Sequence, residues 1–200
     1  IVEYTYDFYK KSRHICNYIE RECLKKIKFN ATNFGKIVIS LSDVAKEPYI
    51  NSSKVLCISI PFNRDKYDSC KSQLECREFI IDCINEGLSL IEAKFDIPSK
   101  EITLSIKDLK NKNYSNSWLH KKKLDRSRKL KVELACELLI NCFQLNLIVY
   151  QNDEVIYNEV ILETDPDEIA YDYKFKDISI DDEKITITNK SNEILYELLL

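Results

Sequence analysis

Apolar side chains occupy every second position between residues 130 and 142 of this 200-residue chain. These positions are Leu130, Val132, Leu134, Cys136, Leu138, Ile140 and Cys142. A period of two residues is typical of a β-strand with one buried face, so we predict a strand over this segment. A helix over residues 132–143 is the competing interpretation, because several apolar residues within it also have helical spacing.

The alternation continues from Phe143 to Val149, but it is shifted there by one residue. We predict a β-bulge at Cys142–Phe143, because one extra residue in a strand would produce this shift. Period-two patterns between polar turns predict further strands over residues 155–162, 171–180, 184–188 and 194–199.

The first half of the chain has mainly helical periodicity. Apolar residues recur at every third or fourth position over residues 12–28 and 71–94, where we predict two long helices. Residues 1–9 fit either a strand or the lead-in to the first of these helices. Short strands are predicted at 36–42, 54–62 and 102–106, and the continuous apolar run of the second indicates a central strand. The polar segments 43–53, 63–69 and 108–127 are expected to form a loop, a turn and an irregular stretch.

Helices in the first half and strands in the second predict an α+β fold. We expect an antiparallel strand meander in the second half, with about two long helices packed on one face of the sheet. The length fits a single domain over residues 1–200, helix-rich over 1–100 and strand-rich over 101–200. Its candidate seam is the polar segment 108–127.

The chain has two glycines, Gly35 and Gly87, and two histidines, His14 and His120. Phosphate-binding and dinucleotide-binding loops need clustered glycines, so these classes are excluded. Neither the His-x-x-x-His nor the Cys-x-x-Cys spacing of common zinc sites occurs. We therefore predict no catalytic, cofactor-binding or metal-binding residues, and an enzyme without a visible motif remains an alternative.

Eight cysteines are present. Cys16 and Cys23, like Cys76 and Cys83, are seven residues apart, which is about 10.5 Å along a helix. A disulfide requires Cα atoms within about 7 Å, so these local pairs are excluded. We predict reduced thiols in the core and a cytoplasmic protein, with long-range disulfides as the alternative. No apolar run approaches the roughly 20 residues that span a bilayer, so no membrane association is expected.

Charge is distributed unevenly along the chain, although the net charge is −3. Residues 107–131 contain ten basic and two acidic residues, a net charge of +8, whereas residues 152–183 contain twelve acidic and two basic residues, a net charge of −10. An acidic surface attracts basic proteins and repels nucleic acid. The candidate partner-binding residues are Asp153, Glu154, Asp165, Asp167, Glu168 and Asp172.

The basic segment supports an alternative function in nucleic-acid binding. Cations bind phosphates, and an aromatic ring can stack on an unpaired base. The candidate residues for this site are Lys121, Lys122, Lys123, Arg126, Arg128 and Trp118.

In its acidic, strand-rich stretch from Leu130 to Glu183, the chain resembles the immunity proteins of bacterial toxin–immunity systems. The stretch runs from Lys131-Val132-Glu133-Leu134 to Asp165-Pro166-Asp167-Glu168. The resemblance implies a non-enzymatic protein that neutralises a basic toxin domain by covering it. The basic segment is then a second partner contact, or the contact of a head-to-tail homodimer with the acidic segment.

Overall fold

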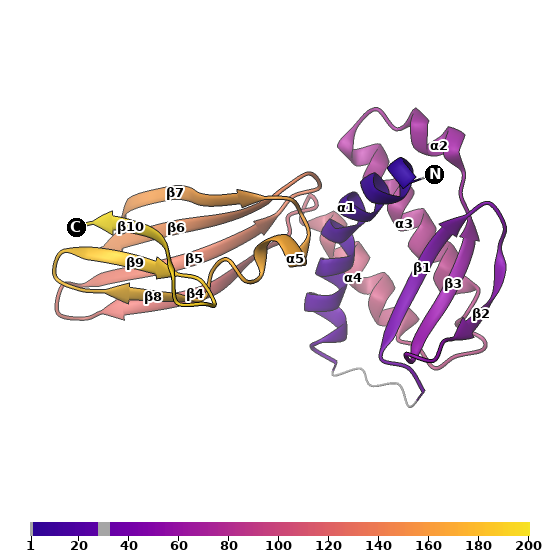
Figure 1. Cartoon of the computed structure of the whole chain (residues 1–200), viewed down its shortest axis with the longest axis horizontal. Coiled ribbons are helices and arrows are strands. Elements are labelled where there is room, and N and C mark those ends of the chain that lie inside the picture. The colour runs from indigo at the N-terminus through magenta and orange to yellow at the C-terminus, as the bar shows by residue number, and fades with distance from the viewer. Residues whose placement is uncertain (1, 28–32) are drawn as a thin grey trace. The chain divides into compact units, whose positions relative to one another are not determined.

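The computed structural model describes residues 2–27 and 33–200, and the side chains from Tyr6 onward within these ranges (Figure 1). The chain forms two compact units. The first unit is Ile15–Tyr114, and the second is Ser115–Leu200 together with the N-terminal residues up to His14. The sequence analysis expected one domain with a candidate seam at 108–127, and the boundary between the units falls within that segment.

The first unit contains a three-stranded sheet in the order β1-β3-β2. Its strands are β1 (Lys36–Ser42), β2 (Lys46–Ile50) and β3 (Val55–Pro61). The predictions of strands at 36–42 and 54–62, and of a central position for the second, are confirmed. The prediction of a loop over 43–53 is wrong, because β2 lies there. Pro48 is compatible with a strand in this case because β2 is at the edge of the sheet.

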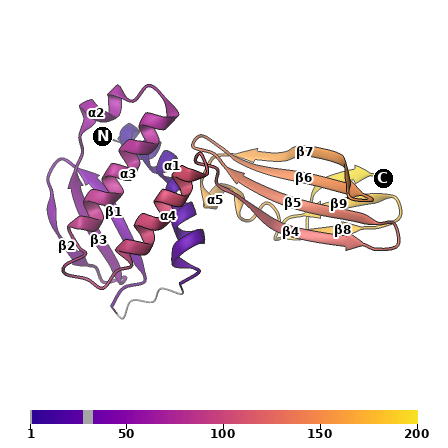
Figure 2. The ribbon, with the colours of Figure 1, turned by 180° about the vertical axis from the view of Figure 1, so that it is seen from behind.

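Helices of the first unit lie on one face of this sheet (Figures 1 and 2). They are the last five residues of α1 (Val2–Ile19), which continues as the π-helix η1 (Glu20–Leu24), and α2 (Arg64–Ser69), α3 (Gln73–Ser89) and α4 (Ser99–Asn111). The helix predicted over 71–94 is confirmed as α3, which begins at a capping box formed by Ser72 and Glu75. The helix predicted over 12–28 is confirmed through Leu24, residues 25–27 form a turn, and residue 28 lies outside the described residues.

Three segments of the first half have a different structure from the one predicted. Residues 2–9 belong to helix α1, so the strand alternative is wrong there. The predicted turn at 63–69 is helix α2, whose first turn is capped by the side chain of Asn63. The predicted strand at 102–106 is part of α4, because Ile102, Ile106 and Leu109 are buried at helical spacing.

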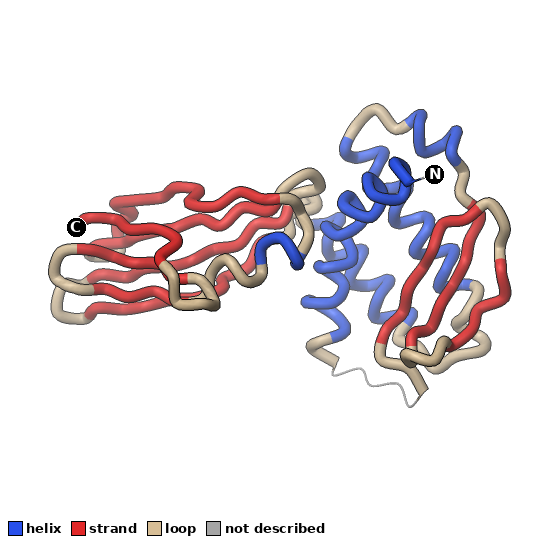
Figure 3. Tube along the Cα trace, viewed as in Figure 1, coloured by secondary structure: helices blue, strands red, loops and turns tan. Residues whose placement is uncertain are grey.

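The second unit is a sandwich of two antiparallel sheets (Figures 1 and 3). One sheet has the order β4-β5-β6-β7 and the other the order β10-β9-β8. The strands are β4 (Ser117–Asp125), β5 (Leu130–Leu138), β6 (Phe143–Gln151), β7 (Glu154–Thr164), β8 (Asp177–Ile180), β9 (Lys184–Thr188) and β10 (Ile194–Leu199). The short helix α5 (Glu168–Tyr171) lies between β7 and β8.

The strand predicted over 130–142 is confirmed over Leu130–Leu138 as β5, and the helix interpretation is wrong. Its alternating apolar residues form the core of the sandwich together with those of β6, β8 and β9. The predicted bulge at Cys142–Phe143 is also wrong, because residues 139–142 form a hairpin loop. Leu138 lies opposite Phe143 across this loop, so the shift in the pattern marks the change from one strand to the next.

The strands predicted over 155–162, 184–188 and 194–199 are confirmed as β7, β9 and β10. Two predictions need correction: strand β8 covers only the last part of 171–180, and 108–127 contains the end of α4 and strand β4 rather than an irregular stretch. The α+β class with antiparallel sheets in the second half is confirmed. Among the described residues, however, helix α3 packs on the mixed sheet of the first half, and the meander packs on a second sheet instead.

Candidate partner-binding groove at the loop end of the sandwich

Three hairpin turns and the end of β10 meet at one end of the sandwich, which we call the loop end (Figure 1). The amide of Asn152 donates to the carbonyl of Lys129 at 3.1 Å, and the amide of Leu200 donates to the carbonyl of Glu183 at 2.8 Å. Arg128 Nη1 donates to the carbonyl of Asp182 at 3.4 Å. These bonds connect the β4–β5 turn with both the β6–β7 and the β8–β9 turns.

An open groove of about 340 Å³ lies at the loop end. Its apolar lining consists of Leu130, Val149, Ile156, Tyr157, Leu198, Leu199 and Leu200. Its polar lining consists of Arg128, Gln151 and Asp182. A mainly apolar concave surface with a few polar groups is the usual composition of a binding site, and this volume lies at the lower end of the usual range of roughly 300–1,000 Å³.

A β-bulge places Ile156 at this groove. Val149 pairs with Tyr157 and Tyr150 pairs with Val155, so Ile156 is the extra residue of β7 between these pairs. Its side chain is 54% exposed although it is large and apolar. Bulges occur preferentially at sheet edges and beside functional sites, where they redirect a side chain.

The groove lies between two edge strands, β7 and β10. Each pairs with one neighbour, β6 and β9 respectively. The two strands are joined by a 2.7 Å hydrogen bond between the hydroxyls of Tyr157 and Tyr196. This bond, together with burial, raises the pKa of Tyr157 to about 12. The exposed apolar residues at the loop-end termini of these two strands are Val155, Ile156, Leu199 and Leu200.

Carboxylates without a cationic partner surround this apolar surface. Asp153 and Glu154 in the β6–β7 turn, and Asp182 and Glu183 in the β8–β9 turn, are exposed and form no ion pair with any described residue. Their neighbour Asp181 instead accepts bonds from the amides of Glu183 and Lys184, which lower its pKa.

The loop end has fewer basic than acidic side chains, and one of the basic side chains is neutralised by an ion pair. Arg128 forms an ion pair with Asp125 at 2.8 Å. Hydrogen bonds from Ser127 and Arg128 hold the pKa of Asp125 far below its usual range. Arg126 and Lys129 are exposed on the β4–β5 turn. Among the described residues, the loop end therefore has five carboxylates outside ion pairs, of which Asp181 is bonded to backbone amides, and two exposed cations outside ion pairs.

The structure divides the predicted acidic residues into two groups. Asp153 and Glu154 lie at the loop end, whereas Asp165, Asp167, Glu168 and Asp172 follow the other end of β7. An eleven-residue strand separates the groups by roughly 30 Å. The sequence analysis assigned all six residues to one acidic surface, and the structure places them at the two ends of β7.

The second acidic group is engaged within its own unit. Asp165 forms an ion pair with Lys10 at 2.7 Å, and Glu168 accepts bonds from two nitrogens of Arg13. Asp167 caps helix α5 by accepting from the amide of Ile169 at 3.1 Å. Asp172 forms an ion pair with Lys190. These four residues therefore stabilise α5 and its contact with α1.

The predicted basic site is also largely occupied by internal contacts. Lys121 lies 3.3 Å from Asp177, and Lys123 donates to the carbonyl of Ile178 at 2.9 Å, so both lysines connect β4 to β8. Lys122 faces Glu133 at 4.0 Å. Trp118 packs against Phe143 with 6.1 Å between ring centroids. The indole is thus part of the sandwich packing rather than an open stacking surface.

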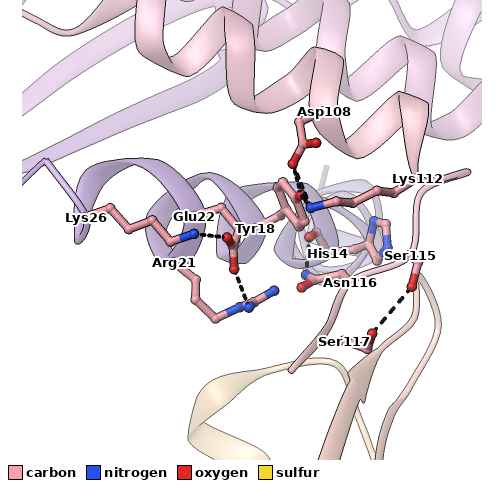
Figure 4. Close-up of polar contacts among 10 residues, drawn as sticks. All are labelled: His14, Tyr18, Arg21, Glu22, Lys26, Asp108, Lys112, Ser115, Asn116 and Ser117. Atoms are coloured by element: carbon pink, nitrogen blue, oxygen red, sulfur yellow. Dashed lines mark hydrogen bonds and ion pairs between the residues drawn. The ribbon is translucent and has the colours of Figure 1, made fainter. Parts of the chain in front are cut away.

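A polar cluster that the sequence analysis missed lies between α1 and α4 in the first unit (Figure 4). The hydroxyl of Tyr18 donates to Asp108, and Lys112 donates to both groups at 2.8 Å. Lys112 lowers the pKa of Asp108, and burial raises that of Tyr18. The three groups satisfy one another, as in a structural clamp. The spacing of Asp108 and Lys112, four residues apart on a helix, is the signal that could have indicated part of it.

The histidine and cysteine side chains lie mostly in packing environments. Among the described residues, no three or more His, Cys, Asp or Glu side chains gather closely enough to hold a metal ion. The ring of His120 packs edge-on against Phe175, with 4.7 Å between ring centroids. All eight cysteines are free thiols, and Cys23, Cys76, Cys83 and Cys136 are buried. No described helix has both the length and the apolar character needed to cross a membrane.

No protein-family model, curated protein or solved structure matches this chain.

Proposed function

We propose that this protein is a non-enzymatic binding domain that captures a basic protein partner through the loop end of its second unit. One observation carries the proposal: an apolar groove on the side of two edge strands, surrounded by carboxylates that have no internal cation. Exposed apolar surface with a charged rim is the usual composition of a protein-binding site.

The rest of the acidic stretch supports this choice of surface. The carboxylates beyond β7 are neutralised by Lys10, Arg13 and Lys190, so they attract a partner less strongly than Asp153 and Glu154 do. The class of partner follows from the resemblance to immunity proteins, which implies a toxin domain with a basic surface. We further propose that the protein acts in the cytoplasm, a reducing compartment that suits its eight free thiols.

Affinity capture from the source cell tests this proposal. The test variant is Asp153→Asn/Glu154→Gln, which removes two charges and keeps a residue that tolerates the left-handed backbone of position 153. The matched control, Glu92→Gln/Asp96→Asn, removes two exposed charges from the first unit.

We expect a basic protein to be recovered in equal amount with the wild type and with the control. The Asp153→Asn/Glu154→Gln variant should recover much less of it, and the loss should shrink as salt rises, because salt screens surface charges. Recovery of no protein, or equal recovery with both variants, would contradict the proposal. Recovery of nucleic acid instead would favour the alternative function of the basic segment.

A further inference from the structure

We infer that the groove at the loop end receives one large apolar side chain from a lysine- or arginine-rich segment of the partner. This inference rests on the proposed function and specifies how the partner is recognised. Three features of the groove lead to it: its lining, its opening and its charge.

The lining favours an apolar occupant. Leu130 and Val149 belong to the sandwich core, and Leu198 and Tyr157 are partly buried, so the floor of the groove is apolar and fixed by the fold. Ile156 and Leu199 are 54% and 79% exposed, so both lose much contact with water when the groove is filled. Removing apolar area from water is the main favourable contribution to such binding.

The opening favours a side chain presented by a protein over a free ligand. The groove is open to solvent, and its lining includes residues of the edge strands β7 and β10. A small molecule there would keep much of its own surface in water, whereas well-bound small ligands bury 70–90% or more of theirs. A side chain that projects from a partner segment fills the floor, and the segment itself covers the rim.

The charge of the rim selects a cationic segment. Asp153 and Glu154 stand at the start of β7, and Asp182 lines the groove beside Glu183. A second copy of this chain would bring the same excess of carboxylates against them, so self-association through this surface is disfavoured. Arg126 and Lys129 lie on the β4–β5 turn. Because like charges repel, we expect the partner's cations to bind on the side of β7 and β10 instead.

Binding of three synthetic peptides to the full chain, measured by isothermal titration calorimetry, tests the inference. The first is Lys-Arg-Phe-Arg-Lys, the second has alanine in place of phenylalanine, and the third is Glu-Asp-Phe-Asp-Glu. We expect the first peptide to bind about tenfold or more tightly than the second, because burial of the ring stabilises the complex. The third should not bind.

Two protein variants assign this binding to the groove. Ile156→Ala/Leu199→Ala should weaken binding of the phenylalanine peptide severalfold, and both positions are exposed enough for the fold to tolerate the change. Ile169→Ala is the matched control, since Ile169 is also 79% exposed but lies on α5. It should bind as the wild type does.

Equal binding of the phenylalanine and alanine peptides would overturn the inference, and so would equal binding by Ile156→Ala/Leu199→Ala and the wild type. A dimer in sedimentation that dissociates in the Ile156→Ala/Leu199→Ala variant would overturn it as well, because the occupant would be a second copy. If a basic partner is captured but either of these two peptide experiments shows equal binding, the proposed function stands. The groove is then not the surface that binds the partner. Peptide binding as expected without capture of any protein supports the groove and contradicts the proposed function.

Discussion

At the scale of single residues, Gly87, one of the two glycines of the chain, has a role in packing. It lies on α3 where the helix packs against β1, and a Cβ atom there would lie 2.7 Å from Cδ1 of Ile39. Such a distance is well inside van der Waals contact, so the helix would have to move or Ile39 would have to change rotamer. Gly87 therefore permits the close approach of α3 to the sheet.

We predict that Gly87→Ala lowers the free energy of unfolding by about 1–3 kcal/mol, the usual cost of overpacking a core. The measurement is urea denaturation monitored by circular dichroism. Gly35→Ala is the control, because nothing lies within 4 Å of the Cβ it would add. Equal stability of the two variants would show that the packing against Ile39 is looser than the structure indicates.

The clamp of Tyr18, Asp108 and Lys112 predicts a dependence of stability on pH. The pKa of Asp108 is lowered in the folded protein, first by its hydrogen bond from Lys112 and then by that from Tyr18. A carboxyl with a lowered folded pKa stabilises the fold above its unfolded pKa of about 3.9, and this contribution is lost as pH falls through the folded value.

Asp108→Asn should therefore lower the melting temperature at pH 7, and its difference from the wild type should shrink below about pH 4. Thermal denaturation over this pH range measures the effect. Glu92→Gln, an exposed carboxylate elsewhere in the first unit, serves as the control and should show no such change. A difference for Asp108→Asn that stays constant down to pH 2 would contradict the role of the ionised carboxylate.

At the scale of elements, the period-two pattern predicted strand β5 because one of its faces is fully buried. Leu134 is 0% exposed in the sandwich core, whereas Leu119 on the neighbouring strand β4 is 53% exposed. We predict that Leu134→Ala costs about 2–5 kcal/mol of unfolding free energy and Leu119→Ala less than about 0.5 kcal/mol. Chemical denaturation of both variants measures the difference in unfolding free energy. Similar costs would contradict the assignment of Leu134 to the buried face of the sheet and of Leu119 to its exposed face.

Elements without a strong period were the ones that the sequence did not predict. The residues Ile102, Leu104 and Ile106 fit a strand as well as one face of a helix, and the burial of Leu109 on α4 resolves the ambiguity only in three dimensions. Strand β2 contains Pro48, and strand β4 contains Lys121, Lys122 and Lys123. Both are edge strands, where proline and lysine are tolerated because one side of the strand has no partner in the sheet.

At the scale of the whole molecule, the linear charge pattern did not predict how the charged residues are distributed over the folded surface. The segment with a net charge of +8 is divided between the two units, since Lys107, Lys110 and Lys112 precede the boundary at Tyr114. The acidic stretch lies within the second unit, but β7 separates its two ends. Which charged residues are neighbours on the surface therefore depends on how the strands are arranged, and not on their order in the sequence alone.

The candidate groove was not visible in the sequence for the same reason. Its lining comes from β5, β6, β7, β10 and two turns, and each contributes one to three residues. Among these residues, the sequence analysis assigns only Arg128 to a binding site, and it does so for a different function. The sequence contained one usable signal, the exposed apolar residues Val155 and Ile156 directly after an acidic turn, but their exposure depends on the edge position of β7.

Hydrogen exchange of the protein alone and with its captured partner tests the central claim most directly. The account predicts slower amide exchange in the complex at the loop end, over residues 151–156, 181–183 and 198–200. Exchange around Asp165–Asp172 and at Lys121–Lys123 should stay as it is in the free protein. Protection at either of those two segments, with the loop end unchanged, would contradict the account.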